Sequence, residues 1–301
     1  MWTFSMSHRG VLLGLLASLI WSGHSTVSSL GISVGLQPMD FAALRVLGVG
    51  GLLLPYLWKR RTLVQRLGLA RCVVLILCAG VPYSLFLTQA LNYAPVSHNG
   101  VVCMGMVPLL ALLIKWLWFK ETPGRRSVQG MLILLAGLGL FALSVLTGTL
   151  GEVWKGDLLF LLCACLWALF GILTARWQVP ALTATAICGV GSLPYLVPYL
   201  WWLEPARLAE VSASQWLLQL LYQGPIVAGV AIYAYSRCAA SMGAERAALF
   251  SAMVPAGTAV VGLLVLAQPV DGLQWLGIGL LTLGIIWTLA GPQRIRRATA
   301  G

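Results

Sequence analysis

Two tryptophans, Trp21 and Trp167, lie near the centres of long apolar segments of this chain, and Tyr83 lies at the centre of another. An indole N–H among apolar side chains needs an acceptor, which the protein, water or a bound solute can supply. His24 follows Trp21 by three residues and so falls almost on the same helix face. These groups either bond to neighbouring parts of the protein or line a cavity in which a solute stacks. We favour the cavity wall for the two tryptophans.

Four further polar residues stand inside or at the start of apolar segments. His98 and Asn99 open one segment, and Tyr222 and Gln223 precede a proline in another. A lone histidine in a membrane helix more often joins two helices by a hydrogen bond than binds a solute. All four are nevertheless candidates for contact with a substrate.

Arg45 lies about two helical turns into its apolar segment. Burying a guanidinium in lipid costs about 2.5–3.5 kcal/mol on insertion scales, so the group should point to a partner or to water. It could hold a substrate carboxylate, reach outward to the membrane surface, or pair with Asp40. The acidic residues all lie near segment ends or in loops, which argues against a carboxylate relay and against a carrier dedicated to cations. They are Asp40, Glu121, Glu152, Asp157, Glu204, Glu210, Glu245 and Asp271.

Five prolines, Pro82, Pro108, Pro194, Pro225 and Pro255, fall near the middle of apolar segments. A proline in a helix interior removes one backbone hydrogen bond and kinks the helix, at a cost of about 3 kcal/mol. In lipid such breaks persist where neighbouring groups or a water-lined cavity satisfy the freed carbonyls. Simple packing kinks are common in membrane helices. Five kinks at similar depth favour a central cavity with flexible points for gating.

The elements that position these residues are membrane helices. The 301 residues are 59% hydrophobic and only 9% charged, whereas soluble domains carry about 25% charged residues. A spanning helix needs about 20 largely apolar residues. Windows of that size predict an all-α membrane protein with ten spans, at 10–31, 38–58, 71–91, 95–118, 128–147, 157–176, 181–203, 215–236, 246–267 and 273–291.

The basic residues predict the orientation. With both termini in the cytoplasm, the outside segments hold only Lys155 and Arg207, while Arg45 and Lys115 lie within spans. The remaining basic residues fall inside, a strong positive-inside bias. This clustering between apolar runs explains the net charge of +11 better than nucleic-acid binding does. The inside residues are Arg9, Lys59, Arg60, Arg61, Arg66, Arg71, Lys120, Arg125, Arg126, Arg176, Arg237, Arg246, Arg294, Arg296 and Arg297.

Two stretches of the chain read alike at a fixed offset. The sequence therefore predicts two copies of one unit, 9–150 and 154–291, each with five spans. Because five is odd, the copies are inverted relative to one another in the membrane, with a substrate site between them near the bilayer midplane. The offset places Pro108 on Pro255, Gly130 on Gly277 and Gly137 on Gly284.

A set of short motifs recurs in a characteristic order. Each half has a tryptophan in its first helix (Trp21-Ser22, Trp167-Ala168), and the first half adds Leu44-Arg45, the run QALNYAPVS at 89–97, Pro108, and Lys120-Glu121 before a Gly-rich fifth helix. In these features the chain resembles the EamA family of the drug/metabolite transporter superfamily. Within it, the chain is most similar to YddG-type exporters of aromatic and other neutral amino acids. Gln268 and Pro269 depart from the pattern, because they replace the acidic residue that Glu121 supplies in the first half. A mechanism that needs a carboxylate there is weakened.

The leading hypothesis is a carrier of the cell's inner membrane that exports small neutral or zwitterionic metabolites, amino acids above all. Transport by alternating access would be uniport-like or weakly coupled. A proton-coupled multidrug exporter that uses histidine is the main alternative, and an intramembrane enzyme or a non-transporting scaffold is more remote. No Walker A, HExxH or nucleophile-elbow motif and no zinc-spaced Cys/His set is present in the sequence. We therefore expect no enzyme activity, metal or cofactor.

Two questions of packing remain open in the sequence. The seven cysteines lie in or beside apolar segments and fit small buried hydrophobes better than disulfides or metal ligands. The glycines of the fifth and tenth spans either pack within one chain or join two chains. Packing within the chain is the simpler interpretation, so a monomer or weak dimer is expected.

Overall fold

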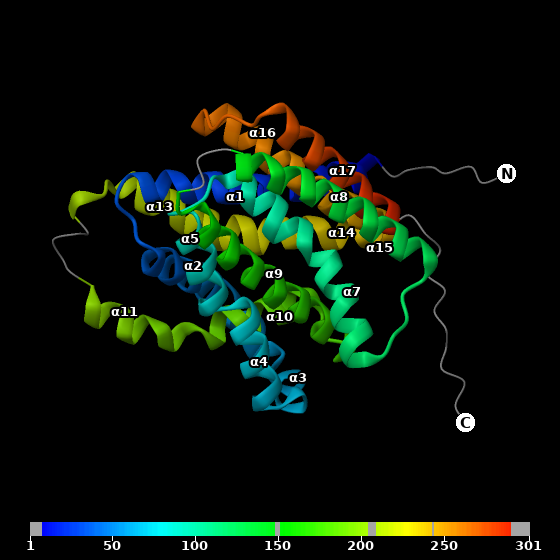
Figure 1. Ribbon diagram of the computed structural model, residues 1–301. Helices are drawn as coiled ribbons and strands as arrows, with labels where there is room; N and C mark the ends of the chain where they lie inside the picture. Colours follow the sequence, from blue (N-terminus) through cyan, green and yellow to red (C-terminus); the bar gives the residue numbers. More distant parts are fainter. Residues whose placement is uncertain (1–7, 148–150, 204–208, 243, 290–301) are drawn as a thin grey trace, which may run out of the picture.

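The computed structural model describes residues 8–147, 151–203, 209–242 and 244–289, and this part of the chain is built from helices (Figure 1). The first half of the chain holds α1 (His8–Ser33), α2 (Pro38–Lys59), α3 (Arg61–Leu67), α4 (Leu69–Ala79), α5 (Val81–Ala90), α6 (Val96–His98), the π-helix η1 (Asn99–Met104), α7 (Gly105–Phe119) and α8 (Arg125–Thr147). The second half holds α9 (Val153–Arg176), α10 (Ala181–Gly191), the 3-10 helix η2 (Leu193–Tyr195), α11 (Leu196–Trp202), α13 (Ala213–Leu221), the π-helix η3 (Tyr222–Ala231), α14 (Ile232–Met242), α15 (Ala244–Ser251), α16 (Val254–Leu266) and α17 (Gly272–Leu289).

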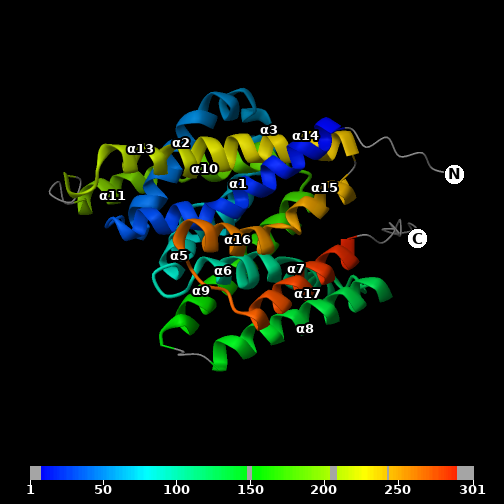
Figure 2. The same cartoon turned by 90° about the horizontal axis from the view of Figure 1, so that it is seen from above.

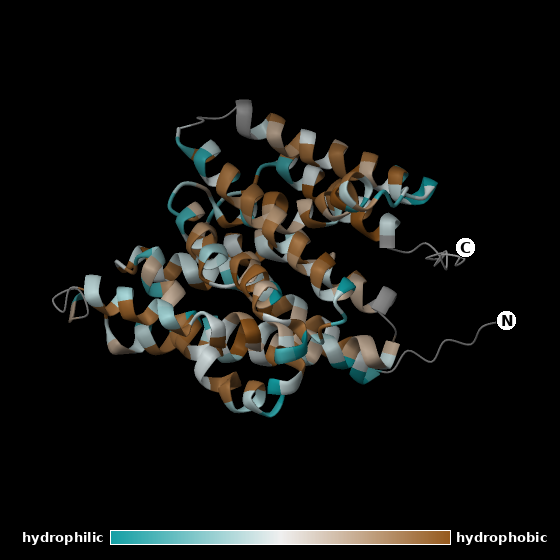
Figure 3. Ribbon diagram, turned by 90° about the horizontal axis from the view of Figure 1, so that it is seen from below, coloured by the Kyte–Doolittle hydropathy of each residue, from teal (hydrophilic) through white to brown (hydrophobic). Residues whose placement is uncertain are grey.

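Nine helical stretches in the described residues are long and apolar enough to cross a membrane, and the apolar stretch Gly272–Thr288 is slightly shorter. Together they cover the ten predicted windows, which supports the all-α fold with five helices in each repeat. Large apolar side chains face outward, as a lipid environment requires; Trp201 is 84% and Leu264 77% exposed. Hydrophobic residues dominate the helices, and the hydrophilic ones gather mostly at their ends (Figure 3). The start of α1 and the end of α17 lie on the same side of the bundle (Figures 1 and 2).

The correspondence of the two repeats is visible at the ends of α7 and α16. Both helices end on a residue in the left-handed region, Lys120 with φ 56° and Ala267 with φ 53°. The next residue in each repeat then reaches a different helix. Glu121 pairs with Arg176 at 3.7 Å, and the Gln268 side-chain oxygen accepts a hydrogen bond of 3.0 Å from the Val96 N–H. The departure from the family pattern at Gln268 therefore replaces an ion pair with a hydrogen bond between the repeats.

The last helix of each repeat, α8 and α17, pack side by side along their length (Figure 2). Glycines allow this close approach. A Cβ on Gly137 would lie 2.6 Å from the Gly277 carbonyl oxygen, and a Cβ on Gly284 would lie 2.7 Å from that of Gly130. Close packing of small residues is a common way to join membrane helices. The glycine faces of the two spans are thus used within one chain, as the simpler sequence interpretation expects.

Replacing Gly137 by leucine should strongly destabilise the fold. The new side chain would meet the Leu281 backbone nitrogen 2.5 Å from its Cβ, and backbone atoms cannot move aside as a flexible side chain can. We expect a loss of at least about 3 kcal/mol, the upper range for overpacked sites, seen as a lower melting temperature in detergent. Gly139→Leu is the matched control, because a Cβ at position 139 would have nothing within 4 Å of it. Equal melting temperatures in the two variants would contradict the packing described for α8 and α17.

The predicted proline sites coincide with breaks or distortions in the helices. Pro82 is in the first turn of α5, just after the α4–α5 break, and Pro194 lies in η2 between α10 and α11. Pro225 lies inside η3, Pro108 inside α7 shortly after η1, and Pro255 in the first turn of α16. A π-helix widens the backbone locally, which relieves the clash between a proline ring and the preceding turn. Whether these points move during function remains a prediction.

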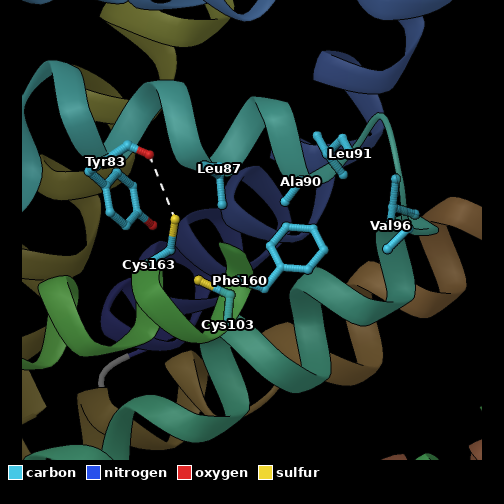
Figure 4. Close-up of a cluster of buried hydrophobic side chains, with 9 residues drawn as sticks. Tyr83, Leu87, Ala90, Leu91, Val96, Cys103, Phe160 and Cys163 are labelled. Carbon is cyan, nitrogen blue, oxygen red and sulfur yellow. Dashed lines mark hydrogen bonds between the residues drawn. The ribbon is translucent and has the colours of Figure 1, made fainter. Parts of the chain in front are cut away.

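A buried cluster joins the two repeats beside these breaks. Tyr83 and Leu87 on α5 pack with Cys103 on η1 and with Phe160 and Cys163 on α9 (Figure 4). The Cys163 thiol donates a 3.7 Å hydrogen bond to the Tyr83 carbonyl oxygen. All seven cysteines are free thiols, six of them buried, so in this fold they act as small packing residues.

Candidate functional site

A cavity lies between the two repeats, with about 80 Å³ of room for the centres of water molecules. Both repeats supply its walls, and the helix breaks at Gly80 and Ser192 border it. None of its lining residues is acidic. They are Trp21, Ala42, Arg45, Val46, Val49, Ala79, Gly80, Val81, Ser84, Trp167, Phe170, Thr185, Cys188, Gly189, Ser192, Val227, Ala228 and Ile232.

Aromatic rings form part of the cavity wall. Trp167 on α9 packs against Phe170 at 5.4 Å and against Tyr83 at 5.3 Å between ring centroids, while Trp21 on α1 packs against Tyr235 at 5.3 Å. Within the described residues, neither tryptophan N–H has a hydrogen-bond partner in the protein. Both indoles belong to the cavity lining, one from each repeat. Tyr83 is 3% exposed and lies behind Trp167 instead of in the lining.

Arg45 is the charged residue of the cavity lining. It is half-buried on α2, with its guanidinium carbon 5.7 Å from the centre of the Tyr83 ring. The ion pairs found among the described residues are His98–Asp157, Lys155–Glu152 and Arg176–Glu121, so Arg45 belongs to none of them. Asp40, the partner considered from the sequence, is fully buried and instead accepts hydrogen bonds from the Tyr199 hydroxyl at 2.9 Å and the Gln37 N–H at 2.7 Å. Arg45 thus offers an uncompensated positive charge to the cavity.

Three predicted residues, His24, Asn99 and Gln223, form a buried polar layer with three others. We define this layer as His24, Ser25, Ser28, Asn99, Gln219 and Gln223. The His24 Nε2 and the Gln223 Oε1 are 2.8 Å apart. The Gln223 amide nitrogen also donates to the Ser28 hydroxyl at 2.9 Å and to Gln219 at 3.2 Å. Asn99 donates to the Ser25 hydroxyl.

The polar layer ties α1 to helices of both repeats. Its bonds link α1 to η3 of the second repeat and to η1 of the first, and the Gln219 amide nitrogen on α13 donates to the Val27 carbonyl on α1 at 2.7 Å. Along α1 it follows Trp21 and so lies farther from the start of that helix. His24, Asn99 and Gln223 are outside the cavity lining. In this conformation their polar atoms join helices to one another.

Tyr222 and His98 also lie outside the cavity lining. The Tyr222 hydroxyl donates a 2.9 Å hydrogen bond to the Ile20 carbonyl oxygen on α1. His98 is buried, its Nδ1 is 2.8 Å from Asp157 on α9, and its ring lies edge-on to Phe141 at 4.9 Å. These contacts fix helices of the two repeats to each other. Of the nine predicted binding residues, the cavity lining thus contains Trp21, Arg45 and Trp167.

Several lining residues, above all Ser192, Thr185 and Phe170, were not expected from the sequence. One signal was available: Gly80 and Ser192 each stand two residues before a mid-span proline. A small residue followed by a helix-breaking proline marks a place where backbone is exposed and another chain segment can approach. The two sites meet, since a Cβ on Gly80 would lie 2.6 Å from the Ser192 hydroxyl oxygen.

Two inverted five-helix repeats around a shared cavity with discontinuous helices define the architecture of a secondary membrane transporter. The model of the EamA-like transporter family matches residues 8–143 and 154–290. The chain therefore belongs to the EamA-like transporter family, and it is a multi-pass membrane transporter.

Relatives of similar length support this membership. An uncharacterized transporter of Bacillus subtilis (strain 168), YwfM, is 24% identical over 293 residues, which cover 96% of each chain. An uncharacterized transporter of Acidianus ambivalens is 27% identical over 255 residues, covering 82% of this chain and 92% of its own. A solved crystal structure aligns with a TM-score of 0.59 at 21% identity, over 94% of this chain and 96% of the other. That likeness concerns the fold alone.

Proposed function

We propose that this transporter carries small neutral or zwitterionic metabolites, chiefly aromatic and other neutral amino acids, out of the cytoplasm. One observation carries the proposal: an unpaired guanidinium and two aromatic walls share a cavity between the repeats, and no acidic residue lines it. A zwitterionic amino acid presents a carboxylate to Arg45 and an apolar or aromatic side chain to Trp21 and Trp167. The resemblance of the sequence to YddG-type exporters is in line with this substrate class.

Transport would proceed by alternating access. In the conformation described, the polar layer holds α1 against both repeats. Opening at the polar layer requires these bonds to exchange for bonds to water or substrate. The backbone changes would occur at the proline sites. Two of them, Pro82 and Pro194, lie at helix breaks beside the cavity. The others are Pro225 within a π-helix, and Pro108 and Pro255 near distorted segments. Because the cavity lining has no carboxylate for a coupling ion, we propose uniport-like or weakly coupled movement.

The proposal includes a cellular arrangement. The bias of basic residues supports a topology with both termini in the cytoplasm, and we propose that the protein lies in the inner membrane. The glycine faces of α8 and α17 are occupied within the chain, so a monomer or a weak dimer suffices for transport.

Flux in liposomes tests the function. Purified protein would be reconstituted into liposomes loaded with unlabelled phenylalanine, leucine or another neutral amino acid, and entry of the labelled compound would be followed. Exchange with an internal pool should make entry faster than in protein-free liposomes by at least about 10-fold for one or more neutral amino acids. Organic cations of similar size should not compete. Equal rates with and without protein across amino acids and related metabolites would exclude the carrier proposed here.

A proton-coupled exporter that uses histidine is the second candidate, favoured by the contact between His98 and Asp157. These residues join η1–α6 of the first repeat to α9 of the second, so protonation there could alter how the repeats meet. This candidate predicts that an imposed pH gradient accumulates substrate in liposomes and that His98→Gln abolishes the accumulation. The uniport-like mechanism predicts that substrate equilibrates without accumulating, in wild type and variant alike.

A further inference from the structure

The break between α4 and α5 leaves backbone donors without partners beside the cavity. α5 has ten residues, and its first turn contains Pro82, which has no N–H. The Ser84 N–H bonds to the Gly80 carbonyl at 3.2 Å. The N–H groups of Val81 and Tyr83 have no hydrogen-bond partner in the described part of the chain. Unsatisfied backbone donors are costly in a membrane, so water or a ligand must complete them.

The end of a helix that carries such donors also carries positive potential. The aligned peptide dipoles of a helix place about half a positive charge at its N-terminus, which favours an anion there. Gly80, Val81 and Ser84 line the cavity, so the N-terminus of α5 borders the space open to a solute. A second polar group without a partner lies at the same corner of the cavity.

That second group is the hydroxyl of Ser192. Ser192 is 4% exposed, it lines the cavity, and its oxygen has no hydrogen-bond partner. Its position is close to the break, because a Cβ on Gly80 would lie 2.6 Å from the Ser192 oxygen. A buried hydroxyl without a partner costs about 1–3 kcal/mol. Such a group is retained at a cost to the empty protein, as expected for a ligand contact.

Arg45 reaches the same corner from α2. The helices α2 and α10 run antiparallel, as the Tyr56–Thr183 and Tyr195–Met39 bonds show. They cross closely at Gly189, where a Cβ would lie 2.4 Å from the Val49 side chain. Arg45 precedes Val49, and Ser192 follows Gly189, by about one turn each. In antiparallel helices these two residues lie on the same side of the crossing.

We propose that Arg45, the Ser192 hydroxyl and the N-terminus of α5 together bind the carboxylate of the transported solute. The guanidinium supplies the charge and paired donors that match a carboxylate. The hydroxyl and the free Val81 N–H complete the bonds to its oxygens, and Trp21 and Trp167 contact the rest of the molecule. This inference rests on the proposed function and narrows it: the substrates are compounds with a free carboxylate, such as amino acids, and not amines or amides of the same shape.

The variant Ser192→Ala tests the inference without removing a bond of the empty protein. Binding of labelled L-phenylalanine and of L-phenylalaninamide would be measured on purified protein, with L-leucine and L-leucinamide as a second pair. Wild type should bind each acid at least about 10-fold more tightly than its amide. Ser192→Ala should weaken binding of the acids by about 10-fold, the effect of losing one hydrogen bond to a charged group, and leave binding of the amides unchanged.

A matched control comes from Thr88 on α5, which is buried like Ser192 but lies outside the cavity lining, and whose hydroxyl bonds to the Ser84 carbonyl of its own helix at 2.8 Å. Thr88→Val should keep wild-type affinity for acids and amides. The melting temperature of Ser192→Ala should equal or exceed that of wild type, because the hydroxyl it removes has no partner.

The outcomes separate this inference from the proposed function. If wild type binds acid and amide equally, or if Ser192→Ala weakens both equally or neither, the carboxylate site is wrong while amino-acid transport stands. If wild type binds none of the four compounds and moves no amino acid in liposomes, the proposed function and this inference fail together.

Discussion

Replacing Arg45 by glutamine is expected to lower amino-acid flux in liposomes by about 10- to 100-fold, which corresponds to hydrogen bonds of about 1.5–3 kcal/mol to a charged group. The same change should leave the melting temperature of the empty protein unchanged or raise it. A half-buried guanidinium without a carboxylate partner is costly in a membrane, and glutamine removes that cost. Arg45→Lys should retain part of the flux, because it keeps the charge but loses the paired geometry.

Lys115 provides the matched control for Arg45. It is the other basic residue that the sequence places within a span, but it is exposed on α7 and outside the cavity lining. Lys115→Gln should transport at the wild-type rate. If Arg45→Gln transports normally, or if it loses activity only because the protein melts at a lower temperature, Arg45 is a structural residue and not a ligand for the substrate.

Replacing Trp167 by alanine should be nearly as damaging to transport. Its indole packs between Tyr83 and Phe170 and forms cavity wall, and stacking of a base or ring on an aromatic side chain is worth about 1–3 kcal/mol. We expect about a 10-fold higher concentration of aromatic amino acid for half-maximal flux, with membrane insertion intact. Trp21→Ala should act in the same direction, because Trp21 lines the cavity from the other repeat.

The control for the tryptophan variants is Trp201, which is 84% exposed on α11 and contributes nothing to the cavity lining. Trp201→Ala should keep the wild-type concentration dependence. Normal transport in both Trp21→Ala and Trp167→Ala would remove the two indoles from the substrate path. A loss for aromatic substrates that spares leucine would show that stacking, and not the shape of the cavity alone, holds the side chain.

The membrane fold could be predicted because its signals are local and repeated. Apolar windows of sufficient length must form helices in lipid, and the two copies of the pattern around Pro108 and Pro255 report the repeat directly. The structure adds features that a local stretch of sequence does not reveal, such as the matching left-handed helix ends at Lys120 and Ala267. These depend on where a helix stops, and the ends of helices are set by contacts with other segments.

The site was predictable only in part. Trp21, Trp167 and Arg45 lie at a depth where Trp and Arg are uncommon in a lipid-facing helix. Residue type and depth alone therefore predict that they face the interior. For His24 and Gln223 the outcome depended on a partner 199 residues away, which a single sequence does not reveal. Given that partner, both side chains satisfy each other within the polar layer instead of facing the cavity.

Ser192 shows the opposite failure. The hydroxyl of a serine or threonine in a membrane helix can bond back to a carbonyl of its own helix, as those of Ser18, Ser28 and Thr88 do here. A serine at position 192 is therefore not marked as a ligand by its residue type. The hydroxyl of Ser192 lacks that bond and lies against the break at Gly80. The information lies in two helix breaks, in different repeats, that meet at one corner of the cavity.

The most direct test is an experimental structure of the protein bound to the amino acid that moves fastest in liposomes. We predict density for that compound in the cavity between the repeats, its carboxylate within hydrogen-bond distance of Arg45 and Ser192 and its side chain against Trp21 or Trp167. Density anywhere else, for example among His24, Asn99 and Gln223 with the cavity empty, would contradict the proposed site.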